Sequence, residues 1–487
     1  MVVSVQDLVA LSIPPINNVN SSPASDVLRT PRAIRVSVRP AARAESPIGL
    51  SGLGVRWTVT LVGFLLYLLV ITSYRLPVGD IAIAIALAGI VLQDSSVRFP
   101  AYLRWLAAFL IWSAVAGLQS SFPDLVTPQL VTVLKMTLIV FVAANALQTR
   151  GQVRLFMVFF LGCFALFPLR GAMFNFFLYR NDMDGRAIWN QLYSNPNDLG
   201  AIALLQLSMA VALVASEKKG WVRWAALAGV IVIPMLILMT QSRGVFLGLV
   251  VFLAIAFAGQ RRRFRFVVIV GTIAVILAAL APGNVWGRLG TMRHATSTST
   301  LDEVDGEDGS ARQRYEIWRV AFKMIGDHPL AGVGLGAYKV NHERYALDPE
   351  FNPTAQGGRD THSLYFNVLA ETGYPGLVLY LGMVLSVGLA AERTRRQCKR
   401  VHESAARQLL LLEAGLVAFL AAAVFGSLPY LPHFLLHLVL LSALVILYRK
   451  DLNVIKGRQP VQQRSQGRPR RGGIRSAVVR TAIGRPQ

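Results

Sequence analysis

The chain contains a succession of apolar segments that are each long enough to cross a lipid bilayer. A hydrocarbon core about 30 Å thick requires roughly 17 to 25 apolar residues per helix. Twelve segments meet this requirement: 57–74, 77–93, 101–119, 125–147, 154–178, 198–216, 221–240, 243–259, 264–281, 374–391, 408–427 and 431–448. Because 54% of the 487 residues are hydrophobic and only 15% are charged, a soluble fold is excluded. We predict an all-α polytopic membrane protein with about twelve transmembrane helices.

The positive charges are distributed so that they define a topology. Basic clusters occupy alternate connections and both tails, and the connecting clusters are Lys218–Arg223, Arg261–Arg265 and Arg393–Arg400. Short loops rich in Lys and Arg stay on the cytoplasmic side, so an even number of spans places both termini there. The net charge of +23 is then a topology signal with a secondary attraction to anionic lipids. We expect the lipid bilayer, and no nucleic acid, as a partner of these charges.

This pattern divides the chain into five regions. Residues 1–50 and 449–487 are expected to be disordered basic cytoplasmic tails. Residues 51–281 hold the first nine helices and residues 374–448 hold the last three. Between the ninth and tenth helices lies a long polar loop, 282–373, with twelve Asp and Glu against nine Lys and Arg. We predict that this loop is partly helical and lies on the outer, periplasmic face.

The long loop contains a segment with helical spacing of apolar residues. Tyr315, Trp318, Ala321, Phe322 and Ile325 recur at intervals of three and four over residues 311–326. We predict an amphipathic helix whose apolar stripe lies on the membrane surface. Arg314, on or beside this stripe, would then lie near phosphate groups.

A second predicted helix in the loop begins at His362. Asp360 or Thr361 is suited to cap it, and Gly373 to end it. His362 is then in the first turn, where the positive helix end disfavours the imidazolium. The sequence predicts a neutral imidazole that can accept a proton, and the alternative is a histidine that only hydrogen-bonds at the interface.

Arg243 is a positive charge in a turn predicted to lie on the outer face, between the seventh and eighth spans. This position runs against the topology rule. One interpretation is an arginine that snorkels to the headgroups. The other is an arginine that binds a specific anion.

Together these motifs resemble the O-antigen ligase family. The resemblance rests on Ser242-Arg243-Gly244, on Arg314 to Trp318 leading into Asp327-His328-Pro329-Leu330-Ala331-Gly332-Val333-Gly334, and on His362-Ser363-Leu364-Tyr365 through Gly373. It implies a multi-pass glycosyltransferase of the bacterial inner membrane, active on the periplasmic face. Such an enzyme moves a glycan from undecaprenyl pyrophosphate to an acceptor, which is the lipid A core in lipopolysaccharide biosynthesis.

The resemblance also implies roles for individual residues. Arg243 and Arg314 would correspond to the essential arginines and His362 to the essential histidine. Guanidinium groups bind phosphate oxygens bidentately, so two arginines can stabilise the departing diphosphate without a metal ion or another cofactor. His362 would be the general base of an inverting displacement, or, if protonated, would bind the diphosphate.

Four further residues are candidates for contacts with the pyrophosphate or the glycan: Arg312, Arg359, Trp318 and Tyr365. Arg314 is preferred to Arg312 as the essential loop arginine because of its spacing to Trp318. A shift by two residues would exchange them.

Other functions remain open at this point. The nearer alternative is an O-antigen or exopolysaccharide polymerase, or a protein O-oligosaccharyltransferase, which share the donor and differ in the acceptor. The more distant alternative is a polysaccharide transporter or flippase, for which Lys135, Arg170 and Glu413 are the candidate charges within spans. Asp80, the Asp182–Asp184 pair and the histidines His433 and His437 are possible metal ligands, which we interpret instead as turn and packing residues.

Overall fold

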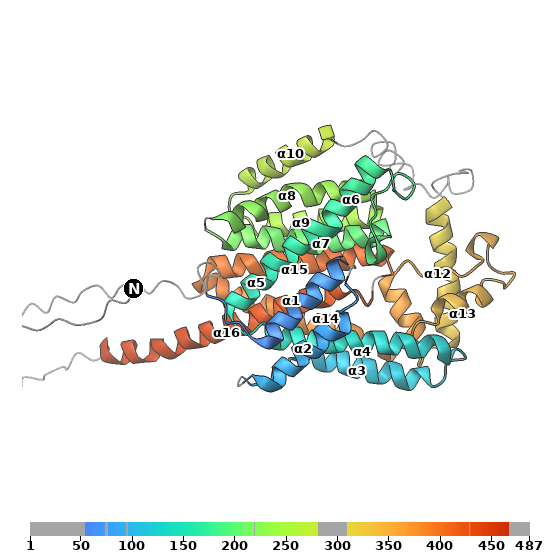
Figure 1. Cartoon of the computed structure of the whole chain (residues 1–487), viewed down its shortest axis with the longest axis horizontal. Coiled ribbons are helices and arrows are strands. Elements are labelled where there is room, and N and C mark those ends of the chain that lie inside the picture. Colours follow the sequence, from blue (N-terminus) through green and yellow to red (C-terminus); the bar gives the residue numbers. More distant parts are fainter. Residues whose placement is uncertain are drawn as a thin grey trace, which may run out of the picture. The chain divides into compact units, whose positions relative to one another are not determined.

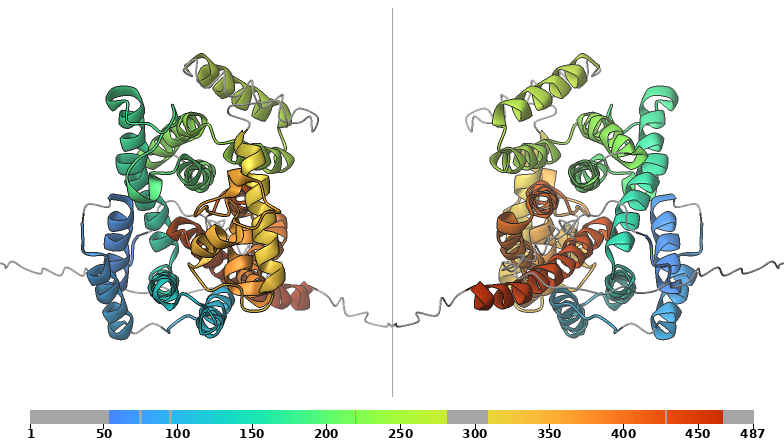
Figure 2. Two further views of the ribbon diagram at one scale, coloured as in Figure 1. Left: turned by 90° about the vertical axis from the view of Figure 1, so that its right-hand side faces the viewer. Right: turned by 90° about the vertical axis from the view of Figure 1, so that its left-hand side faces the viewer.

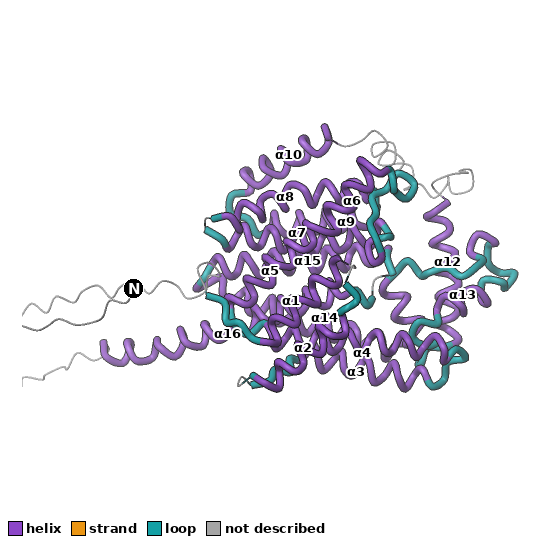
Figure 3. The backbone as a smooth tube through the Cα atoms, in the orientation of Figure 1, coloured by secondary structure: helices purple, strands orange, loops and turns teal. Residues whose placement is uncertain are grey.

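The computed structural model describes residues 54–73, 76–93, 96–218, 220–280, 309–427 and 429–466. Across these ranges the regular structure is helical and no β-strand occurs (Figure 3). A single isolated bridge joins Met183 and Arg186. The prediction of an all-α chain is therefore confirmed.

The helices follow the predicted segments closely. In chain order they are α1 (Val59–Ser73), α2 (Gly79–Leu92), α3 (Ala101–Gly117), α4 (Pro123–Ala146), α5 (Arg150–Phe164), α6 (Arg170–Phe174), α7 (Pro196–Ser216), α8 (Trp221–Thr240), α9 (Arg243–Ala258), α10 (Arg263–Leu280), α12 (Gly309–Asp327), α13 (Tyr338–Tyr345), α14 (Leu364–Val401), α15 (Glu403–Ala422) and α16 (Pro432–Gln466). The π-helical stretch η1 (Ala165–Leu169) joins α5 to α6, and a second one, η2 (Asn175–Tyr179), continues α6, so that residues Arg150–Tyr179 form one continuous helical segment. Short 3₁₀ turns are η3 (Gln191–Tyr193), η5 (Pro353–Ala355) and η6 (Ala423–Phe425).

Within the described part of the chain, seven helical segments are long and apolar enough to cross a membrane. α1, α2, α3 and α9 are shorter apolar helices. The chain is thus a multi-pass membrane protein, and the number of twelve crossings stays a prediction.

Burial shows which helices form the centre of the bundle. In α7 and in α16, 78% and 83% of the apolar window are buried, against 28% in α4. α15 packs against α7, α9 and α14 beside this centre (Figure 1). α4 therefore presents much of its surface outward, as a helix in contact with lipid does.

The connections gather at the two ends of the bundle in the alternation that the charge pattern predicts. At one end, Arg261 in the α9–α10 turn pairs with Glu403 at the start of α15. At the other end, α12 and α13 cover the start of α4 and the first part of α14 (Figures 1 and 2). Their contact includes Ala321 and Ile325 of α12, Val126 of α4 and Leu369 of α14. Which end faces the periplasm remains a prediction from charge.

α14 is a broken helix, and the break lies at Gly373. This glycine has φ 69° and ψ −176°, which only glycine adopts without strain. The helical hydrogen bonds are interrupted there, so backbone groups on both sides of the break need other partners.

The glycine-rich loop before α13 supplies those partners. The N–H groups of Val333 and Gly334 donate to the carbonyls of Ala370 and Glu371, at 2.9 and 3.1 Å. Trp112 Nε1 donates to the Thr372 carbonyl at 2.8 Å. Beyond the break, the Tyr374 N–H donates to the Pro329 carbonyl at 2.9 Å.

The glycines allow this close approach between loop and helix. A methyl group at Gly332, where φ is 66°, would lie 2.4 Å from the Glu371 carbonyl carbon. These glycines therefore form a tight loop against the broken helix.

Two details of the sequence prediction are corrected by the structure. The apolar stripe of α12 does not lie wholly on the membrane surface: Ala321 and Ile325 are buried against the protein, while Tyr315 and Phe322 are exposed. α16 also continues past the predicted span to Gln466, so residues 449–466 of the predicted tail are helical. The reason is that Arg449 donates to Thr394 Oγ1 at 2.9 Å and Asp451 pairs with Arg150. The predicted tail 1–50, residues 467–487 and the first part of the long loop lie outside the described residues.

We predict that Gly373→Ala destabilises the protein strongly. The added methyl group would lie 1.9 Å from the Leu330 carbonyl oxygen, and the backbone conformation alone costs a non-glycine residue about 1–3 kcal/mol. The apparent melting temperature in detergent should fall by several degrees. Gly388→Ala is the matched control in the same helix, because nothing lies within 4 Å of the position of the added methyl group. Equal melting temperatures for the two variants would contradict the role of the break.

Candidate active site

His362 lies immediately before α14 and not in its first turn. The helix starts at Leu364, Ser363 is its extended N-cap residue, and His362 has a left-handed backbone with φ 49°. The predicted position is therefore wrong by two residues. A hydrogen bond from the Ser363 N–H to Thr361 Oγ1 at 3.3 Å, and one from Thr361 Oγ1 to the Ser363 carbonyl at 2.9 Å, hold the turn around the histidine.

The surroundings of His362 favour the neutral imidazole. Burial lowers the pKa of His362 below its usual value, and the nearby positive charges of Arg314 and Arg359 lower it further, against an opposite effect of Asp360. The predicted neutral state is thus favoured, but by burial and by Arg314 more than by the helix end. A neutral imidazole can accept a proton near pH 7.

Trp318 of α12 fixes the turn that carries His362. Its indole Nε1 donates to the Thr361 carbonyl at 2.9 Å. Its ring packs between those of Phe366 and Phe425, with centroids 5.3 and 6.2 Å away. Trp318 therefore positions the site from the side of α12, and Arg314 precedes it by about one helical turn.

Arg243 is brought to the same end of the bundle by the first turn of α9. Ser242 is the N-cap residue and is buried, and Arg243 is half-buried at the first helical position. The next residue, Gly244, lies against Phe425, since a methyl group there would be 3.0 Å from Phe425 Cβ. Phe425 is thus close both to the start of α9 and to Trp318.

The structure adds residues that the sequence interpretation had assigned to turns or had not used. Asp198, in the first turn of α7, lies close enough to Asp360 for their charges to interact. Arg186 joins two helix ends by donating to the Thr240 carbonyl at 2.9 Å and to Asn197 Oδ1 at 2.8 Å. Arg186 was detectable by the argument applied to Arg243, because it is a positive charge in a connection predicted to lie on the outer face.

The remaining predicted site residues differ in whether they act on His362. Arg359 is exposed, donates to the Gln356 carbonyl at 3.2 Å, and acts on the pKa of His362. Arg312 is half-buried and does not contribute to that shift, which favours Arg314 as the arginine beside the histidine. The Tyr365 hydroxyl donates to the Leu420 carbonyl at 3.0 Å, so it ties α14 to α15.

The other candidate charges have structural partners. Lys135 pairs with Asp80 at 2.9 Å, and Glu413 pairs with Arg395 at 2.7 Å. Asp182 accepts a hydrogen bond from the Gly185 N–H at 2.8 Å and so forms a turn. His433 and His437 are buried and contact the Tyr193 hydroxyl and the Leu412 carbonyl. In the described ranges, no three His, Cys, Asp or Glu side chains are grouped to hold a metal ion.

At this end of the bundle a half-buried histidine lies close to arginines of the long loop. Arg314 and Arg359 act on the pKa of His362 in one direction and Asp360 in the other. Arg243 is next to Gly244, which lies against Phe425 of the aromatic cluster. Guanidinium groups suit a phosphate ligand, and a neutral imidazole suits the removal of a proton.

The fold and the site define a multi-pass helical membrane protein with a basic, histidine-containing cluster at one end. Residues 227–381 match the family model described as O-antigen ligase. This match supports the family that the motifs predicted, whose members are glycosyltransferase-like ligases and polymerases. A search of curated proteins found no matching relative.

We predict that Arg314→Gln raises the pKa of His362 towards its usual value. Loss of the positive charge removes a repulsion that disfavours the imidazolium, so protonation becomes easier. The measurement is an NMR titration of labelled histidine, with the His362 signal assigned from its loss in His362→Gln. Arg319→Gln, also on α12, is the control, because Arg319 pairs with Glu316 and does not act on His362. An equal shift in both variants would contradict the proximity of Arg314.

Proposed function

We propose that this protein is an O-antigen ligase that transfers a glycan from undecaprenyl pyrophosphate to the lipid A core on the periplasmic face of the inner membrane. The observation that carries the proposal is the environment of His362, which is half-buried, is lowered in pKa and lies close to Arg314. A charged histidine would add only another positive group to an arginine cluster. A neutral histidine adds a base.

In this proposal the acceptor hydroxyl attacks the anomeric carbon of the donor glycan. The hydroxyl proton passes to His362 as the new carbon–oxygen bond forms. The bond from the anomeric carbon to the diphosphate breaks on the opposite face, and its electron pair leaves with the diphosphate. Such a displacement inverts the configuration at the anomeric carbon.

Arg243 and Arg314 are proposed to bind the departing diphosphate. The leaving group gains negative charge in the transition state, and positioned guanidinium groups stabilise that charge where it develops. The first turn of α9 contributes in the same direction, because its N-terminal N–H groups carry a partial positive charge. We therefore expect transfer to proceed without a divalent metal ion.

Trp318 has a positioning role in the proposal. Its hydrogen bond to the Thr361 carbonyl and its stacking on Phe425 connect the turn of His362 with the side of α9. Arg312 and Arg359 are proposed to assist in binding the donor, whereas Tyr365 is not assigned a substrate contact because its hydroxyl already bonds to Leu420.

The direct test is glycan transfer in reconstituted membranes that contain the donor and lipid A core, with EDTA present. We expect His362→Ala to lower the rate by roughly 10²–10⁴-fold, the typical contribution of a general base. Arg243→Ala and Arg314→Ala should each lower it by roughly 10²–10³-fold, as loss of a charge-stabilising donor does. Arg319→Ala is the matched control on α12 and should retain activity.

The products of the same assay distinguish the related functions. Glycosylated core supports the ligase. Longer glycan on the carrier with unmodified core would identify a polymerase, and glycan on protein would identify an O-oligosaccharyltransferase. Absence of diphosphate release from any acceptor would favour a transporter.

The pH dependence of transfer gives a further prediction. A base must be unprotonated, and burial together with Arg314 lowers the pKa of His362 from its usual value. The value of kcat/KM should thus be constant near neutral pH and fall at acidic pH as His362 becomes protonated. In Arg314→Gln the fall should begin at higher pH, because the pKa of His362 rises. A rate that increases as the pH falls below 6.5 would show instead that the protonated histidine binds the diphosphate.

A further inference from the structure

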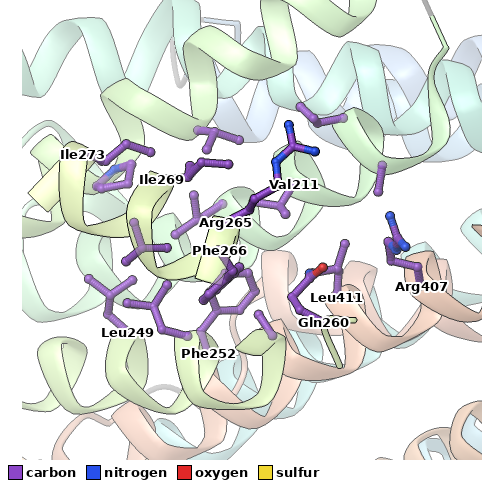
Figure 4. Close-up of a pocket in the computed structure, with 18 of the residues that line it drawn as sticks. Val211, Leu249, Phe252, Gln260, Arg265, Phe266, Ile269, Ile273, Arg407 and Leu411 are labelled. Atoms are coloured by element: carbon purple, nitrogen blue, oxygen red, sulfur yellow. The ribbon is translucent and has the colours of Figure 1, made fainter. Parts of the chain in front are cut away.

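A second candidate site lies between α10 and the bundle, at a distance from His362. A partly open cavity of about 750 Å³ is lined by residues of α7, α8, α9, α10 and α15. This volume lies within the range of roughly 300–1,000 Å³ that is typical of ligand sites. Its walls are apolar and include Val211, Leu249, Phe252, Phe266, Ile269 and Ile273 (Figure 4).

The position of these walls determines what can occupy the cavity. They belong to apolar helices of a membrane protein, where water has no polar partners. α10 itself is mostly exposed, and Leu277 is its buried hydrophobic residue. A hydrocarbon chain is the chemical match for the space.

One end of the cavity is strongly basic. Five arginines line it: Arg223, Arg261, Arg262, Arg265 and Arg407. Arg261 and Arg407 share Glu403, at 3.3 and 3.2 Å. Arg223 donates to the Glu217 carbonyl at 2.8 Å.

Arg262 and Arg265 differ from the other three. In the part of the chain that the structure describes, no carboxylate pairs with either of them. Arg265 lies on α10 and Arg262 in the turn before it, so they flank the same entrance to the cavity. Two guanidinium groups beside an apolar cavity suit a ligand that has a phosphate group attached to an acyl chain.

We propose that this cavity binds a single anionic phospholipid, with an acyl chain between α10 and the bundle and the phosphate on Arg262 and Arg265. This end of α9 is opposite to Arg243, and the sixteen residues of the helix span about 24 Å. The headgroup is therefore remote from the proposed diphosphate site. It lies on the face that the charge pattern predicts to be cytoplasmic, where anionic lipids attract basic clusters.

The separation along α9 also favours a phospholipid over the undecaprenyl carrier. The carrier's diphosphate must reach Arg243 and Arg314 at the opposite end in the proposed reaction. A bound phospholipid would connect α10 to the bundle, because its acyl chain would pack between them and its phosphate would bind Arg262 and Arg265.

The test uses the full-length protein, delipidated in detergent and then given phosphatidylglycerol or phosphatidylcholine with identical acyl chains. Bound lipid is counted by native mass spectrometry. We expect one retained phosphatidylglycerol per chain, weaker binding of phosphatidylcholine, and a higher melting temperature with phosphatidylglycerol. Arg262→Gln combined with Arg265→Gln should weaken phosphatidylglycerol binding by roughly tenfold or more.

The control removes the same charge from the same predicted face. Arg393→Gln with Arg400→Gln lies on exposed positions of α14 that do not line the cavity, and should leave binding unchanged. Ile269→Trp provides an independent test by filling the cavity while keeping both arginines, and should also expel the lipid. Melting temperatures without added lipid show whether each variant is folded.

Equal retention of the two lipids would overturn the proposal in favour of an unselective acyl site. Copurification of undecaprenyl phosphate in place of phospholipid would assign the cavity to the carrier. Equal loss of binding in the control pair would show that only the general surface charge matters.

Discussion

The break at Gly373 is the feature on which the polar end of the molecule depends. An uninterrupted α14 would satisfy its own backbone and leave no groups for the loop to bind. With the break, the carbonyls of Ala370, Glu371 and Thr372 accept hydrogen bonds from Val333, Gly334 and Trp112. The glycine-rich loop is thus held against α14 by hydrogen bonds between backbone groups, which do not depend on the side chains of the bonded residues. α12 in turn packs on this assembly, which places Arg314 and Trp318 beside the start of the same helix.

Local information explains what the sequence analysis predicted correctly, and long-range contacts explain what it missed. The spans, the helix of the long loop and the importance of Arg243 follow from local information, namely hydropathy, spacing and a charge that violates the topology rule. The helix end predicted at Gly373 agrees with the break in α14. The partners of that break do not follow from local information, because Trp112 is 260 residues away from the carbonyl that it binds. α16 extends past its apolar segment for a similar reason, since Arg449 and Asp451 find partners on α14 and α5.

The position of His362 shows a different limit. Asp360 and Thr361 are good capping residues, so the sequence favours a helix that begins at once. In the structure Thr361 instead bonds to Ser363 and contacts Ser427, with the hydroxyl oxygens 3.1 Å apart, and His362 takes a left-handed conformation. The Thr361 hydroxyl, which the sequence suggests as a helix cap, therefore bonds within the turn and to Ser427, in the segment after η6. Nothing in the spacing of residues 360–364 reveals that partner. The neutral imidazole was predicted from the positive helix end, whereas in the structure burial and the charge of Arg314 lower the pKa of His362.

The charged residues fall into two groups, those with a structural role along the bundle and those with a proposed binding role at the ends of α9. Several charges along the bundle are paired, as with Lys135 and Asp80 or Arg395 and Glu413, because an isolated charge in the hydrocarbon region is costly. Each end of α9 also carries arginines, namely Arg243 at its start and Arg261 to Arg265 after its end. Guanidinium groups suit phosphate, and the ligand that each end can hold depends on what lies beside the arginines. Next to Arg262 and Arg265 there is an apolar cavity, which suits a lipid that stays bound. At the other end of α9 are Arg243 and the aromatic cluster of Phe425 and Trp318, and Arg314 acts there on a half-buried histidine. This arrangement is suited to a diphosphate that leaves as the acceptor loses its proton.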